Sequence, residues 1–140
     1  RLDNVHAAIL SYKMSYYGDV IDRRRHIARK YHETLRVFEG VKLPPSPDED
    51  SNYFDIYQNY EFCSSNRDEL RELLKNHGIG TIVQWGGFGI HQLENLGMGM
   101  ALAKTDKFFS ESMLLPLNHV MTEEQVEHVC ATLRSYFEVN

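Results

Sequence analysis

The chain has 140 residues, of which 42% are hydrophobic and 25% are charged, and its formal net charge is −5 at pH 7. This balance is ordinary for one globular domain with an apolar core of its own. The acidic charge argues against a nucleic-acid-binding protein, and no apolar run approaches the roughly 18 residues of a membrane span. Because no secretory leader pattern is visible, we expect a reducing, cytoplasmic setting without nucleic-acid or membrane partners.

The two cysteines and seven histidines show no metal-binding pattern. Cys63 and Cys130 are too far apart in sequence to form a CxxC pair, and no two histidines have the HExxH spacing of a zinc-binding helix. Each cysteine falls in an apolar segment, so we expect two reduced thiols in the core. The sequence predicts no metal site.

Residues 1–39 have the pattern of a long helical segment. Apolar side chains recur there at intervals of three and four residues, and Gly18 followed by Asp19 interrupts the pattern near its middle. We therefore predict two helices, or one kinked helix, with the break near residues 17–19. Gly40 is expected to cap the C-terminal end of this segment.

One strongly basic run, RRRHIARK at residues 23–30, lies inside the helical segment. It has two interpretations. In the first it is a solvated helix face, on which Asp19, Asp22 and Glu33 pair with the basic side chains at helical spacing. In the second the run is an anion-binding site.

The remainder of the chain alternates short strands with helices. Residues 41–52 contain three prolines and are predicted to form a loop. Strands are expected at residues 53–62, 79–84 and 113–117, and helices at residues 67–76 and 106–112 and after Thr122. Three short strands with helices on one face make a two-layer α/β sandwich, which we place at residues 53–140.

The last helix has the clearest local signal. Thr122 and Gln125 have the spacing of a capping box, in which each side chain bonds the other residue's backbone N–H. Helical spacing then predicts which side chains of this helix are buried. They are Val126, Val129, Leu133 and Phe137.

The segment TIVQWGGFGIHQ, residues 81–92, contains the only tryptophan of the chain beside three glycines. We interpret Gln84 to Gln92 as a substrate-facing loop, because glycines let the backbone approach a ligand closely. Trp85 either fills the core or forms the wall of a cleft. His91 is either a structural residue or a hydrogen-bonding group for the ligand.

Four segments, in order along nearly the whole chain, resemble the C-terminal small domain of the DegT/DnrJ/EryC1/StrS family. This family comprises sugar aminotransferases that depend on pyridoxal phosphate (PLP). The resemblance rests on the motifs RLDNVHAAILSYKM, RRRHIARKYHETL, NRDELRELLKNHGIGTIVQW and LLPLNHVMTEEQVEHVC.

The resemblance implies the small domain of a fold-type I enzyme, with a short, mainly antiparallel three-stranded sheet. It implies a homodimer that moves an amino group from glutamate to a nucleotide-linked keto-sugar, with PLP as cofactor. The Schiff-base lysine would belong to a large domain upstream of residue 1, so no catalytic residue is expected here and the chain alone should be inactive. Gln84, Trp85 and His91 would contact the substrate, and Arg1 would lie near the cofactor phosphate.

The loop departs from the family pattern in one respect. QWGGFGIH stands where many relatives have H-Y-x-x-P-(L/I)-H, which leaves the identity of the sugar open. Two other functions also remain open. Some relatives replace the lysine with histidine and are PLP-dependent sugar dehydratases, and a non-catalytic binding or dimerisation module would have the same fold.

Overall fold

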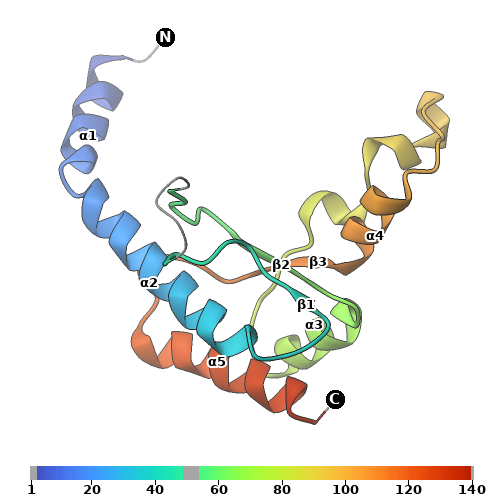
Figure 1. The fold of residues 1–140 in the computed structure, drawn as a ribbon. Helices are drawn as coiled ribbons and strands as arrows, with labels where there is room; N and C mark the ends of the chain where they lie inside the picture. Colours follow the sequence, from blue (N-terminus) through green and yellow to red (C-terminus); the bar gives the residue numbers. More distant parts are fainter. Residues whose placement is uncertain (1–2, 49–53, 140) are drawn as a thin grey trace.

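The computed structural model describes residues 3–48 and 54–139, and Figure 1 shows their path. Helices and short strands are interspersed along the chain, as the α/β class predicts. The helices are α1 (Asn4–Met14), α2 (Tyr17–Leu35), α3 (Arg67–Asn76), α4 (Ala103–Glu111) and α5 (Glu123–Phe137). The strands are β1 (Val41–Lys42), β2 (Tyr60–Ser64) and β3 (Ser112–Leu115), and three 3-10 turns cover Gln84–Gly87 (η1), Ile90–Gln92 (η2) and Glu94–Leu96 (η3).

The three strands form one antiparallel sheet in the order β1-β2-β3. The antiparallel three-stranded sheet is therefore confirmed, but two strand positions are wrong. Residues 79–84 contribute only an isolated bridge between Ile82 and Leu114, and β1 lies in the predicted loop. A two-residue strand shows no alternation that a sequence pattern can detect.

The expected strand over residues 53–62 begins only at Tyr60, for a physical reason. Tyr57 has a left-handed backbone, with φ of 49°, which breaks an extended strand. The guanidinium of Arg24 donates to the backbone oxygens of Tyr57 and Gln58 at 3.1 and 3.0 Å. A long-range contact thus holds the chain in a turn that the local sequence pattern does not indicate.

The basic run of α2 joins elements that are distant in sequence. Arg29 forms a bidentate pair with Asp48, Arg23 pairs with Glu123 at the start of α5, and Arg25 donates to the Asp55 and Pro47 oxygens at 2.6 Å. The expected pairing along the helix with Asp19, Asp22 and Glu33 is wrong for these arginines, at least within the described part of the chain. Their guanidinium groups hold the fold together.

The helical boundaries follow the local signals closely. The break between α1 and α2 falls at residues 15–16, just before the predicted position, and α3 has the predicted bounds. Gly40 is not the helix cap, because α2 ends at Leu35; its φ of 75° belongs to the turn before β1. Thr122 and Gln125 form the predicted capping box.

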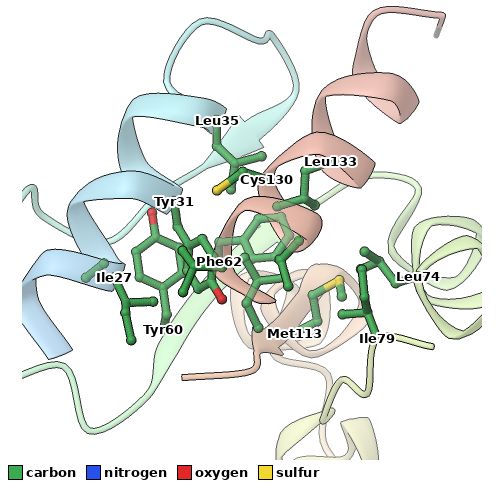
Figure 2. Packing of buried hydrophobic residues seen from close by; sticks show 14 of the residues in the cluster. Ile27, Tyr31, Leu35, Tyr60, Phe62, Leu74, Ile79, Met113, Cys130 and Leu133 are labelled. Carbon is green, nitrogen blue, oxygen red and sulfur yellow. The ribbon is translucent and has the colours of Figure 1, made fainter. Parts of the chain in front are cut away.

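The core lies between one face of the sheet and helices α2, α3 and α5 (Figure 2). Alternate residues of β2, Tyr60 and Phe62, point into it. Both thiols are free and buried, as predicted; Cys130 belongs to the core cluster, whereas Cys63 lies on the opposite face of the sheet. On α5 Val126, Val129 and Leu133 are buried, whereas Phe137 is half-buried and stacks on Phe38.

Two segments project from this core. In Figure 1, α1 and the segment of residues 84–111, which we call the arm, extend on the same side of the molecule. No residue of α1 is buried. Among the described helices, none is long and apolar enough to cross a membrane.

Candidate substrate-binding site

The arm begins with a strained turn that displays Trp85. Trp85, Gly86 and Gly87 have consecutive left-handed backbones, with φ of 53°, 68° and 81°. This conformation is natural for glycine but costs a residue with a Cβ roughly 1–2 kcal/mol. The Trp85 side chain is 80% exposed, so it does not fill the core. A large apolar side chain held outward in a strained conformation is typical of a functional position.

Beside Trp85 lies an open apolar groove of about 560 Å³. Its lining contains three aromatic side chains and no charged one, so a ligand there is held by contact and stacking. Four of the six lining residues lie in the loop predicted from Gln84 to Gln92, and only Leu93 and Phe109 lie outside it. The lining consists of Trp85, Phe88, Gly89, Ile90, Leu93 and Phe109.

A hydrogen-bond network behind the groove closes the arm on itself. Nε2 of His91 lies 2.7 Å from Oδ1 of Asp106, in the first turn of α4. The same oxygen accepts from the Gln92 amide at 2.8 Å, and Oδ2 accepts from the Leu102 N–H at 3.1 Å. The bond with His91, followed by the Leu102 N–H, holds the pKa of Asp106 below its usual value. These contacts fix the arm between η2 and α4.

His91 is a buried structural residue of this network. Its ring is 6% exposed and lies against Gly89, where a Cβ would come within 2.4 Å of Cε1. Gly89 is therefore required for the ring to fit. The structural interpretation of His91 accounts for these contacts, and its direct contact with a substrate stays a prediction.

The other two expected site residues have different surroundings. Gln84 opens η1 and is half-buried, and its amide makes no hydrogen bond with any residue that the structure describes. It precedes Trp85 but is not among the residues that line the groove, so its contact with a substrate stays a prediction. Arg1 lies outside the described residues.

Arg67 anchors the base of the arm. Its side chain, 12% exposed, donates to the Phe109 oxygen at 2.6 Å and contacts the Ser112 oxygen at 3.4 Å. Phe109 lies in the last turn of α4, where backbone oxygens lack a helical partner. A Cβ at Gly87 would lie 3.8 Å from this guanidinium. Arg67 thus joins α3 to both ends of the arm, a contact that no sequence spacing indicates.

The described residues do not by themselves fit a PLP site. Such a site needs a desolvated lysine beside a cradle for the phosphate. None of the six lysines is buried, and Lys30, the least exposed, pairs with Glu123 at 3.8 Å. The described part of this chain therefore lacks a lysine placed to bond the cofactor.

The comparisons with known proteins agree with this arrangement. The sequence profile of the DegT/DnrJ/EryC1/StrS aminotransferase family matches residues 1–134. The chain therefore belongs to this family of aminotransferases.

The relatives show how much of a family member the chain represents. It is 29% identical to the pleiotropic regulatory protein of Geobacillus stearothermophilus over 98% of its own length. It is 27% identical to dTDP-3-amino-3,6-dideoxy-alpha-D-galactopyranose transaminase of Aneurinibacillus thermoaerophilus over 97%. In both cases the chain spans 37% of the relative.

Solved structures share the fold. The crystal structure of S. venezuelae DesV in complex with a ketimine intermediate superimposes with a TM-score of 0.85 at 22% identity, over 99% of this chain and 37% of DesV. An aminotransferase of the same family from Brucella abortus gives a TM-score of 0.81 at 24% identity, over 98% of this chain and 36% of that one.

Proposed function

We propose that this chain is the substrate-covering, C-terminal domain of a PLP-dependent aminotransferase that moves an amino group from glutamate to a nucleotide-linked keto-sugar. The observation that carries the proposal is the exposed, left-handed Trp85 at the edge of an apolar groove, in a chain of this family. A relative named as a dTDP-sugar transaminase supports the substrate class. When bound, PLP supplies the group that accepts the amine and later releases it.

The surroundings of Trp85 and Gln84 allow the roles that we propose for them. The indole of Trp85 offers a flat face on which the apolar face of a sugar ring or a base can stack. The Gln84 amide can bond a hydroxyl. Nε2 of His91 is bonded to Asp106 and Nδ1 lies against Gly89, so we assign His91 to the substrate through the resemblance alone. Arg1 is assigned to the cofactor phosphate through the resemblance alone.

The remaining machinery would come from the part of the relatives that this chain does not match. We assign the cofactor lysine to that large domain and propose that it and a second subunit cover the projecting segments. The exposed apolar side chains of α1 and the arm support this, because a soluble surface rarely leaves so many together. They include Val5, Ile9, Tyr12, Leu96, Met98 and Met100, each at least 45% exposed.

A chimera tests the proposal. The chain would replace the matched 37% of the Aneurinibacillus transaminase, and amine formation on nucleotide-linked keto-sugars would be measured with PLP and glutamate. We expect amino-sugar product, and Trp85→Ala should raise KM. Val37→Ala is the control, since Val37 is 69% exposed, lies just after the end of α2 and is outside the groove.

Two outcomes would contradict the proposal. A chimera that folds and binds PLP yet forms no amine would remove the aminotransferase assignment. A deoxygenated sugar formed without consumption of glutamate would indicate the dehydratase chemistry.

A further inference from the structure

A second pocket lies on the other side of α4 from the groove, and three lysines line it. It has a volume of about 500 Å³ and lies between β1 and α4. Lys42 of β1 is paired in register with Cys63 of β2, so both side chains lie on the sheet face opposite the core. Lys104 and Lys107 of α4 complete the cationic lining. Three lysines from two elements thus surround one hollow in a chain whose net charge is −5.

Two of these lysines have no anionic partner among the residues that the structure describes. Lys107 pairs with Glu111 one helical turn away, at 3.8 Å. Lys42 and Lys104 make no ion pair with a carboxylate of the described residues, whereas Lys30 and Lys75 pair with Glu123 and Glu72. The pocket therefore retains an excess of positive charge.

The pocket also has a neutral hydrogen-bonding group and a well-defined floor. Ser65 lines it with its hydroxyl, and the buried Cys63 forms its base. Burial raises the pKa of the Cys63 thiol, and the nearby Lys42 ammonium opposes part of this rise. The Lys42 ammonium is thus close to the base of the pocket.

A lysine on an edge strand often serves only to prevent sheet-to-sheet aggregation. That role explains Lys42 but not Lys104 and Lys107, which α4 directs to the same hollow. Nor is this pocket part of the apolar groove. Phe108 lines the lysine pocket and Phe109 lines the groove, and consecutive residues of a helix point in directions about 100° apart.

We propose that Lys42, Lys104 and Lys107 form an oxyanion site for a phosphate or diphosphate group, separate from the Trp85 groove. Lysine ammonium groups bind phosphate as mobile point charges, and the Ser65 hydroxyl can donate one further hydrogen bond. The volume holds a diphosphate. This site does not depend on the aminotransferase function proposed above.

Isothermal titration of the chain with inorganic pyrophosphate at low ionic strength tests the site. We expect saturable binding that weakens about fivefold on Lys42→Met and on Lys104→Met. Glu111→Gln should tighten it, because the change frees Lys107 and removes the negative charge of the lining. Lys75→Met is the matched control: it removes a paired surface lysine outside the pocket and should leave the affinity unchanged.

A second titration, with dTDP, distinguishes binding of free diphosphate from binding of the diphosphate of a nucleotide. If dTDP binds, pyrophosphate displaces it and Trp85→Ala leaves its affinity unchanged, the diphosphate of a nucleotide occupies the lysine pocket. Pyrophosphate binding without dTDP binding restricts the site to the free anion. Absence of saturable pyrophosphate binding, or an equal loss on Lys75→Met and Lys42→Met, overturns the proposal. Amide chemical shifts provide a second measurement, with changes expected near residues 40–42 and 104–108.

Discussion

The His91–Asp106 hydrogen bond, 2.7 Å from Nε2 to Oδ1, joins the glycine-rich turn to the first turn of α4. The histidine is buried and the aspartate half-exposed, so the bond lies at the boundary between the arm and solvent. Trp85 and the groove are exposed parts of the same arm. The bond therefore keeps this apolar surface in one shape.

Asp106→Asn should lower the melting temperature of the chain at neutral pH. The folded-state pKa of Asp106 is depressed, so its contribution to stability is present above the ordinary value near 3.8 and is lost as pH falls through the folded value. The difference in melting temperature between wild type and variant should therefore shrink below about pH 4. Melts from pH 3 to pH 7 measure it; a difference that stays constant with pH contradicts the role of this carboxylate.

Trp85 should matter for ligand binding and little for folding. Trp85→Ala is expected to leave the free energy of unfolding nearly unchanged, whereas truncation of a core tryptophan lowers it by roughly 3–5 kcal/mol. Trp85→Gly should be more stable than Trp85→Ala by about 1 kcal/mol, because glycine adopts the left-handed backbone freely. Urea unfolding of both variants decides. A large loss of stability in both would show that the indole is structural.

Gly87→Ala should destabilise the chain by about 1–2 kcal/mol. Its φ is 81°, and the added Cβ would lie 3.4 Å from Cγ1 of Val83 and 3.6 Å from the Phe109 oxygen. Gly18→Ala is the matched control. Gly18 lies in α2 with no neighbour within 4 Å of an added Cβ, so the change should stabilise by up to about 1 kcal/mol. If Gly87→Ala and Gly18→Ala change the free energy of urea unfolding equally, residue 87 does not require glycine.

Arg67→Met should loosen the arm with the core intact. The change removes the donor to the Phe109 oxygen, so the fluorescence anisotropy of Trp85, the only tryptophan, should fall. Arg71→Met is the control on the same helix, where the guanidinium contacts Thr81 and not the arm. If both variants change the anisotropy equally, Arg67 has no specific part in holding the arm.

Local chemistry made much of the fold predictable. The Thr122 capping box, the bounds of α3 and the buried face of α5 all depend on residues within a few positions of one another. The short strand β1 and the turn at Tyr57 escaped prediction because contacts from distant residues create them.

The site was predictable only in part, for the same reason. The glycines around Trp85 marked the turn, but nothing in the sequence indicates that Asp106 meets His91 or that Arg67 meets Phe109. The residue types of the groove, such as Phe88 and Ile90, are equally typical of a core. Their exposure became evident only from the fold.

The most direct measurement uses the protein expressed from the complete reading frame that contains these residues. It would be incubated with PLP, glutamate and a nucleotide-linked keto-sugar, and the products would be quantified by mass spectrometry. The account predicts 2-oxoglutarate and amino-sugar nucleotide in equal amounts, with a higher KM for the sugar nucleotide in Trp85→Ala. Bound cofactor with neither product formed, or turnover that Trp85→Ala does not alter, would contradict it.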